Sequence, residues 1–206
     1  MKRILVLDAF TNGHEAAIAF MRRQGWLDAE CVLLFCGSFD KLLARLARES
    51  VYAVVPVRNS TIEGSEITEV TRPLAALRAK GLHLAELDRV VLPVEHHLLV
   101  QACVESAAEL ECVLTYRRAF EQCQRYLDNL GIPHDRRLRR NSTAGAAKIV
   151  SQLGDQARFA AIASRLAAEA YGLRILAQGI QDDPDNKTTF VLLKHVANGH
   201  CEGARR

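Results

Sequence analysis

Three groups of polar side chains follow directly after apolar runs, at residues 59–64, 115–122 and 186–190. In open α/β sheets, ligands bind beyond the carboxyl ends of the strands. Hydroxyl and amide groups at these positions are therefore candidates for holding a small molecule. The same residue types also form turns and cap helices, so a purely structural role stays open at this point.

Other motifs give weaker chemical signals. The sequence contains no Walker loop and no GxGxxG, HExxH or GxSxG motif. The adjacent His96 and His97 would point to opposite faces of a strand, which is a poor arrangement for sharing a metal ion. The basic run 135–140 is typical of a solvated face rather than of a nucleic-acid site.

Composition indicates a folded protein that handles small molecules. Of 206 residues, 49% are hydrophobic and 25% are charged, which is ordinary for a globular chain and argues against disorder. The net charge of +3 suits a small anionic ligand better than a nucleic acid. Residues 1–7 resemble a first strand rather than a signal peptide, and no apolar run reaches the roughly 18 residues of a membrane span. We therefore expect a cytoplasmic protein without a membrane partner.

The cysteines are expected to be reduced, buried thiols, because none of them shows CxxC spacing. They are Cys31, Cys36, Cys103, Cys112, Cys123 and Cys201.

Short apolar runs alternate with longer amphipathic stretches, which predicts an α/β architecture with mostly parallel sheets. Pro73 is expected near the first turn of its helix or at a kink. The polar stretch 178–187 fits a crossing between lobes or a surface loop. The predicted strands are 3–8, 30–36, 52–57, 89–100 (one strand or a pair), 111–115, 158–163 and 187–194, and the predicted helices are 14–25, 38–49, 67–79, 117–130, 143–152 and 164–171.

Six segments, in order and with matching spacing, resemble motifs of the prephenate dehydratase family over residues 5–194. Residues 55–65 are similar to its VPxENSxEG segment, and residues 186–190 are similar to NxTRF. Any one motif is weak, but six in the same order are specific. The others are residues 92–99, similar to the strand that follows in the family, 115–123 (SHPQALxQC), 141–144 (ESTSAA), and 160–164 with 171–173 (AAIAS and YGL).

The resemblance implies a fold and a reaction. The fold is a single domain over residues 1–206, made of two α/β lobes like those of periplasmic binding proteins, with the active site in the cleft. The reaction removes the ring carboxylate and the 4-hydroxyl of prephenate, giving phenylpyruvate, carbon dioxide and water, in L-phenylalanine biosynthesis. The family needs no metal or organic cofactor, and its members are expected to be homodimers. Lobe one would comprise about residues 1–94 plus 180–206, and lobe two about 95–179.

The resemblance also assigns site residues. Thr188 matches the Thr of TRF, which the family places at the departing hydroxyl, so it is the predicted catalytic residue. A threonine hydroxyl is a weak acid, so its role would rest on orientation and hydrogen bonding. The predicted substrate-binding residues are Asn59, Ser60, Gln122, Thr115, Thr11, Arg58, Thr189 and Phe190.

Several positions depart from the family pattern. Thr189 replaces the Arg of TRF, while Arg58 and Asn141 replace two glutamates that pair in the family. Loss of both members of one pair suggests a reorganised site. The other departures are Tyr116-Arg117 for the His-Pro of SHP, one extra residue (Thr61 or Ile62) in the turn before Glu63, and residues 8–13 in place of GPxGTFS.

These departures leave more than one activity open. A decarboxylating dehydratase acting on prephenate is the first hypothesis, because Thr188 is retained. The second hypothesis is a non-aromatising prephenate decarboxylase that keeps the 4-hydroxyl and serves a specialised pathway. The lost Arg at position 189 supports it. So does the expected lack of room for a C-terminal regulatory ACT domain, which related decarboxylases also lack. The remaining alternatives are a dehydratase for a related cyclohexadienyl acid and a catalytically inactive module that binds small anions.

Overall fold

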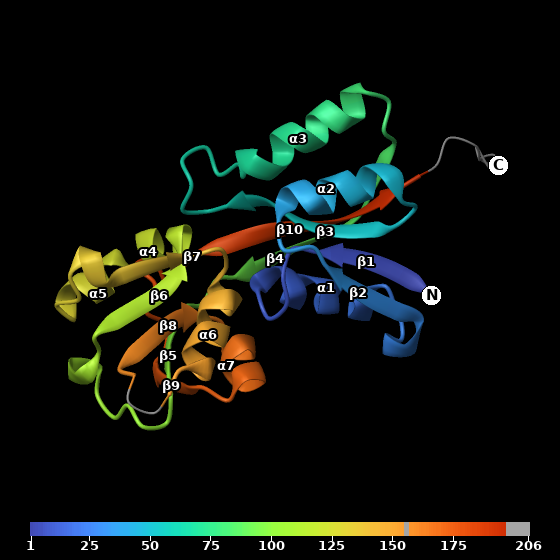
Figure 1. The fold of residues 1–206 in the computed structure, drawn as a ribbon. Helices are drawn as coiled ribbons and strands as arrows, with labels where there is room; N and C mark the ends of the chain where they lie inside the picture. Colours follow the sequence, from blue (N-terminus) through green and yellow to red (C-terminus); the bar gives the residue numbers. More distant parts are fainter. Residues whose placement is uncertain (155–156, 197–206) are drawn as a thin grey trace, which may run out of the picture. The chain divides into compact units, whose positions relative to one another are not determined.

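Contacts between residues divide the chain into two compact units (Figure 1). The computed structural model describes residues 1–154 and 157–196, so Cys201 lies outside the described residues. Residues 8–15, 92–94 and 180–188, which are predicted for lobe one, lie in the second unit. Among the described residues, the first unit comprises Met1–Leu7, Ala16–Val91 and residues 189–196, and the second comprises Asp8–Glu15 and Leu92–Thr188.

The first unit is built on a five-stranded sheet of order β2-β1-β3-β10-β4, in which β1 runs parallel to both β2 and β3. Helices α2 and α3 cover one face of the sheet and α1 covers the other (Figure 1). The alternation of β1 explains this layering, because Leu5 packs against α2 while Ile4 and Val6 are buried on the opposite face. The elements are β1 (Lys2–Val6), α1 (Asn12–Arg23), β2 (Cys31–Phe35), α2 (Phe39–Arg48), β3 (Tyr52–Asn59), α3 (Thr68–Ala79), β4 (Leu84–Pro93) and β10 (Lys187–His195).

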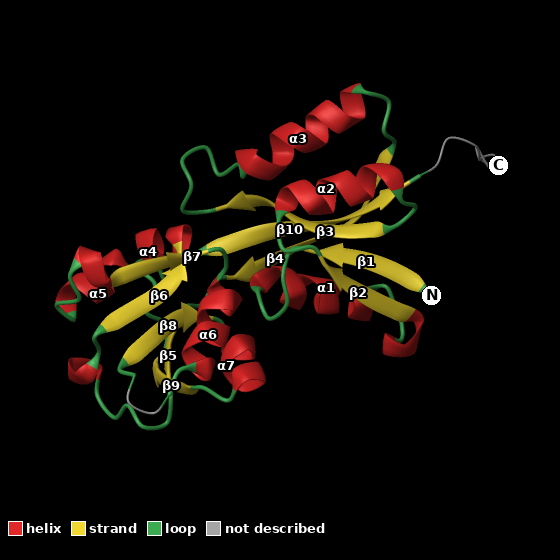
Figure 2. Ribbon diagram, viewed as in Figure 1, coloured by secondary structure: helices red, strands yellow, loops and turns green. Residues whose placement is uncertain are grey.

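The second unit has a five-stranded sheet of order β7-β6-β8-β5-β9 (Figure 2). Strand β6 is parallel to β7 and β8, whereas β5 is antiparallel to both β8 and β9. The expectation of mostly parallel pairing is therefore wrong for this sheet, because β5 inserts between two strands that α7 connects. The elements are β5 (His97–Val100), β6 (Cys112–Tyr116), α4 (Arg117–Gln122), α5 (Gln124–Asn129), β7 (Arg137–Arg140), α6 (Thr143–Gln152), β8 (Phe159–Ala163), α7 (Arg165–Tyr171) and β9 (Arg174–Ala177).

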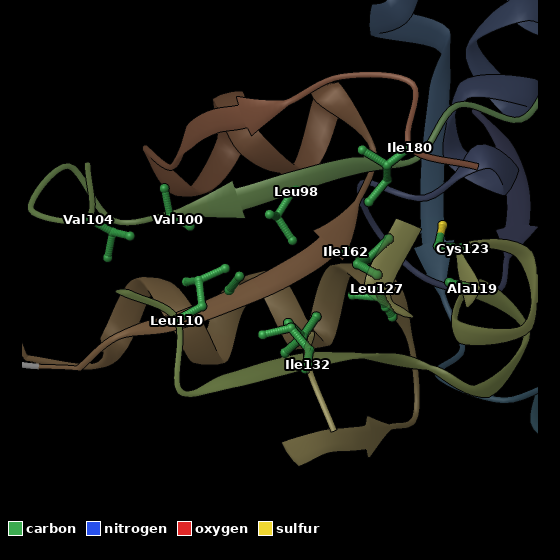
Figure 3. Close-up of a cluster of buried hydrophobic side chains, with 12 residues drawn as sticks. Leu98, Val100, Val104, Leu110, Ala119, Cys123, Leu127, Ile132, Ile162 and Ile180 are labelled. Atoms are coloured by element: carbon green, nitrogen blue, oxygen red, sulfur yellow. The ribbon is translucent and has the colours of Figure 1, made fainter. Parts of the chain in front are cut away.

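Both faces of the second sheet are buried. On one face, Leu98 and Ile162 join a cluster beneath α4 and α5, which includes Leu127 and Cys123 (Figure 3). The other face carries small residues such as Ala161, over which α6 and α7 pack closely. The α/β prediction is confirmed for both units, and no helix among the described residues has the length and apolarity to cross a bilayer.

The helix predicted over residues 117–130 is broken in two at Cys123. The backbone N–H of Arg125, in the first turn of α5, donates to both carboxylate oxygens of Asp182 at 3.2 Å. Helix starts leave such donors without partners, and here a carboxylate far away in sequence satisfies one. The polar stretch after β9 thus stabilises the break, which a local helical pattern cannot reveal.

Three further expectations need correction. The basic run is not simply a solvated face, because it forms β7, and Arg137 is largely buried with its guanidinium donating to the backbone oxygen of Ile132. Pro73 lies inside α3 beyond its first turn, so its expected place near the first turn is wrong, while the alternative of a kink stays a prediction. Of the described cysteines only Cys123 is fully buried, although all of them are free thiols.

The predicted strand pair is present as β4 and β5, and β9 is a strand the sequence pattern misses.

Replacing the carboxylate that caps α5 should destabilise the protein. Asp182→Ala should lower the free energy of unfolding by about 1 kcal/mol, the usual effect of a lost helix cap. Asp182→Asn keeps an acceptor oxygen and should retain most of the wild-type free energy of unfolding. Asp185→Ala, at a side chain 88% exposed, is the matched control. Urea unfolding followed by circular dichroism measures all three, and equal loss in Asp182→Ala and Asp185→Ala would contradict the capping role.

Candidate functional site

One edge of the second sheet gathers the ends of its parallel strands. Because β6, β7 and β8 run in the same direction, their carboxyl ends lie at the same edge. Helices α4, α6 and α7 begin within three residues of these ends, so backbone N–H groups of helix starts collect there. This is the edge at which α/β sheets place their ligands.

Ser142 links the start of α6 to the segment Asp8–Glu15. Its hydroxyl accepts a hydrogen bond from the backbone N–H of Gly145 at 2.9 Å, as a helix cap, and donates to the Asp8 carboxylate at 2.6 Å. A Cβ on Gly145 would lie 2.9 Å from this hydroxyl oxygen, which is too close, so glycine at this position allows the cap to form. A carboxylate near a helix start is also favoured by the helix dipole.

Ser164 makes an equivalent link from α7. Its hydroxyl accepts from the backbone N–H of Ala167 at 3.2 Å and donates to the backbone oxygen of Phe10 at 2.9 Å. The Phe10 ring packs edge-on against Tyr171, with 5.4 Å between centroids. Phe10 has a φ of 57°, a conformation that L-residues with large side chains rarely adopt. The two serines and the aromatic contact together hold this backbone in place.

The fastened segment carries Thr11, one of the predicted substrate-binding residues. Its hydroxyl donates to the backbone oxygen of Asp8 at 2.9 Å, and its own backbone oxygen accepts from the N–H groups of His14 and Glu15. The chain therefore folds back on itself where the family has glycines. Thr11 is fixed relative to the start of α1.

Two titratable groups follow in the same segment. The imidazole nitrogen Nδ1 of His14 accepts from the backbone N–H of Phe10 at 3.1 Å, and burial lowers the pKa of His14. Burial, together with the charge of Glu95, raises the pKa of the Glu15 carboxyl. Both groups are thus biased toward their neutral forms.

Gln122 and Thr115 lie in different surroundings, although the same motif contains both. The side-chain oxygen of Gln122, at the end of α4, lies 2.8 Å from Nε2 of the buried His96. Thr115 is fully buried, and its hydroxyl donates to the backbone oxygen of Ile162 at 2.6 Å. Its hydroxyl thus ties β6 to β8 inside the sheet, and a contact with substrate stays a prediction.

In the first unit, Asn59 ends β3 and organises the turn after it. Its side-chain oxygen accepts from the backbone N–H and the hydroxyl of Thr61 at 3.0 and 2.6 Å. Thr61, one of the two candidates for the extra residue, therefore fixes the amide of Asn59. Arg58 and Ser60, on either side of the buried Asn59, are exposed.

The three predicted site residues on strand β10 lie on different faces of the strand, because successive side chains alternate. Thr188 and Phe190 are 7% and 3% exposed, whereas the intervening Thr189 is less buried. Because successive strand residues point to opposite faces, Thr189 faces away from Thr188. The position that holds Arg in the family thus lies on the other side of β10 from the predicted catalytic hydroxyl.

The structure adds residues that sequence reasoning did not select. Asp8, Ser164, His96 and Asp182 hold the segments that carry Thr11 and Gln122. A serine immediately before a helix is a recognisable cap signal, but its second contact is long-range and leaves no local pattern. Among the described residues, no three His, Cys, Asp or Glu side chains cluster closely enough to hold a metal ion.

Comparison with known proteins matches most of the chain. The family model for prephenate dehydratase covers residues 8–198. A bifunctional chorismate mutase/prephenate dehydratase of Neisseria gonorrhoeae is 35% identical over 192 residues, covering 88% of this chain and 50% of the relative. Arogenate dehydratase/prephenate dehydratase 1 of Arabidopsis thaliana is 41% identical over 141 residues, covering 68% of this chain and 33% of the relative.

A solved structure agrees with these matches. Prephenate dehydratase of Arthrobacter aurescens, solved in complex with L-Phe, has a TM-score of 0.73 and 25% identity, over 95% of this chain and 61% of that one. The chain spans about half or less of the length of the two curated relatives above.

Acidification should weaken the segment that carries Thr11. With its pKa lowered in the folded state, His14 stabilises the fold fully above its unfolded pKa of about 6.5 and loses this contribution as pH falls below that value. His14→Asn offers an oxygen that accepts the Phe10 N–H and does not titrate. We expect the two proteins to have similar unfolding free energies at pH 8, and the wild type to fall relative to His14→Asn toward pH 5. A difference that stays constant across this range in urea unfolding would contradict the assignment.

Proposed function

Because the chain belongs to the prephenate dehydratase family, we propose that it is a lyase that removes the ring carboxylate and the 4-hydroxyl of prephenate. The products are phenylpyruvate, carbon dioxide and water, which places the step in phenylalanine biosynthesis. The observation that carries this proposal is the family match over residues 8–198. Arogenate is the second substrate to test, because some relatives are named arogenate dehydratases.

The chemistry asks for orientation and a well-placed hydrogen-bond donor. Breaking the bond from the ring to the carboxylate releases carbon dioxide, and the electron pair expels the 4-hydroxyl as the ring becomes aromatic. Hydroxide leaves far more readily once a proton reaches it, and positioned proton donors typically contribute about 10²–10⁴-fold. Hydroxyl and amide groups on a rigid frame stabilise by hydrogen bonds the charge that develops on the leaving oxygen, and the proton that completes water comes from solvent.

Thr188 is the residue we assign to the departing hydroxyl. It is a buried hydroxyl near the start of β10, and the strand restricts its χ1 because threonine is β-branched. Its hydroxyl is too weak an acid to be the final proton source. We therefore assign it to orienting the leaving group and stabilising the charge that develops on it.

Gln122, Thr11 and Asn59 are the polar groups that we assign to binding the substrate. Each is held by a hydrogen bond to its own unit of the protein, so its direction is set before a ligand arrives. Groups preorganised in this way lose little entropy on binding. The expected homodimer stays a prediction.

Loss of the family's Arg, here Thr189, favours a second candidate. A decarboxylase would release carbon dioxide but keep the 4-hydroxyl. An arginine that pairs with the departing carboxylate stabilises the ground state, so its absence helps carbon dioxide leave. Retention of Thr188 favours the dehydratase instead, because only the dehydratase needs to assist hydroxyl loss.

Product identity separates these activities. The protein is incubated with prephenate and, separately, with arogenate, and products are identified by mass spectrometry. Phenylpyruvate from prephenate is the expected result. A product that has lost carbon dioxide and kept its hydroxyl would replace the proposal with the decarboxylase. Binding of either compound without turnover would leave only a binding module.

Removing the Thr188 hydroxyl should slow turnover strongly. Thr188→Ala should reduce kcat by about 10²-fold or more, as the loss of one donor to a developing charge does, and Thr188→Ser, which keeps the hydroxyl, should retain most of the wild-type kcat. Ser151→Ala, which removes a hydroxyl bonded to the backbone oxygen of Lys148 on α6, is the control. Steady-state kinetics with prephenate measures all four proteins. An unchanged kcat in Thr188→Ala would remove this residue from the reaction.

A further inference from the structure

His96 contacts Gln122 from a buried position in which its backbone is held by two hydrogen bonds. Its ring nitrogen Nε2 lies 2.8 Å from the side-chain oxygen of Gln122, and the residue is 6% exposed. Its backbone N–H donates to the side-chain oxygen of Gln181 at 3.0 Å, and its backbone oxygen accepts from the N–H of Ile180 at 2.9 Å. The imidazole can therefore shift little.

The contact has a direction. In this orientation the oxygen of the Gln122 amide faces His96, and because an amide oxygen only accepts hydrogen bonds, Nε2 of His96 is the donor. Burial lowers the pKa of His96, which favours the neutral ring with a single N–H, and in this orientation of the amide that hydrogen is on Nε2. With its oxygen held in this way, the amide of Gln122 directs its two N–H groups away from His96.

The backbone of Gln122 is held by the same segment that holds His96. The backbone N–H of Asp182 donates to the backbone oxygen of Gln122 at 2.6 Å. Cys123 and Ile180, the chain neighbours of Gln122 and Gln181, belong to one buried cluster (Figure 3). The position of Gln122 is thus defined at both its main chain and its side chain.

We propose that His96 is a positioning residue that fixes the amide of Gln122 so that its N–H groups, rather than its oxygen, meet an anionic group of the substrate. This inference rests on the proposed function for the substrate-binding role of Gln122. An amide that rotated by 180° would present its oxygen to a carboxylate and repel it. A ring hydrogen on Nε2 of His96 disfavours this rotation, because Nε2–H would then face the amide N–H groups.

Substitutions that keep or remove the donor test this proposal. The amide nitrogen of glutamine reaches the position of Nε2, whereas that of asparagine falls short. His96→Gln should retain kcat/KM within a few-fold, and His96→Asn should lose about 10- to 100-fold, the range expected when a buried polar group loses its partner. The loss should appear mainly in KM, because the carboxylate is present in both the ground state and the transition state.

A double-mutant cycle separates positioning from a general effect on folding. If His96 acts through Gln122, then His96→Asn should cost almost nothing in a Gln122→Ala background. Equal losses in both backgrounds would overturn the proposal, as would equal losses in His96→Asn and His96→Gln. Thermal unfolding of each variant by circular dichroism shows whether the fold is retained.

A further measurement does not depend on turnover. Nitrogen-15 NMR of the imidazoles in the wild type should show His96 with its hydrogen on Nε2, and Gln122→Ala should shift that signal. If the wild type neither turns over nor binds prephenate or arogenate, the proposed function fails while this spectrum still reports the His96–Gln122 contact. Hydrogen on Nδ1, or a signal unmoved by Gln122→Ala, would overturn the positioning role whatever the activity.

Discussion

The hydrogen bonds that Ser142 and Ser164 donate to residues 8–15 are the constraint on which the candidate site depends. Each serine caps a helix with its oxygen and holds this segment with its hydrogen. Helix starts need such acceptors whether or not a ligand binds. The site therefore uses groups that the fold already requires, and Thr11 is held in place through contacts that also complete α6 and α7.

Four titratable groups described in the second unit are either hydrogen-bonded or shifted toward their neutral forms. The Asp8 carboxylate meets a serine hydroxyl and a helix start, while His14, Glu15 and His96 are shifted by burial toward their neutral forms. A frame of this kind would suit the dianionic prephenate that we propose as substrate, because further buried carboxylates would repel it. Replacement of the family's paired glutamates by Arg58 and Asn141 changes the charge in the same direction.

Local patterns predicted those parts of the fold that local physics controls. The leucines of α2, spaced on one face, and the apolar strands β1 and β3 were placed within a few residues because burial of one face determines them. The break at Cys123 was missed because the partner of the α5 start is Asp182, far along the chain. The sequence pattern does not predict strand β7, because an arginine is normally read as exposed. Arg137 is largely buried here, with its guanidinium donating to the backbone oxygen of Ile132.

The sequence predicts the residue types of the candidate site but not the hydrogen bonds that hold its side chains in place. Thr188 and Gln122 came from motif order, and the structure describes a buried hydroxyl and a hydrogen-bonded amide at these positions. For His96 the sequence suggests only a poor metal ligand, because its adjacency to His97 says nothing of a contact with a glutamine 26 residues away. Contacts between segments that are distant in the sequence position these side chains, and a single sequence does not reveal such contacts.

The most direct test of this account is whether the amide of Gln122 meets the substrate. In the Thr188→Ala variant, which should bind prephenate but turn it over slowly, the side-chain N–H signals of Gln122 can be followed by nitrogen-15 NMR as prephenate is added. The account predicts that both signals shift with the same saturation as binding measured by calorimetry. Saturated binding with these signals unmoved would contradict it.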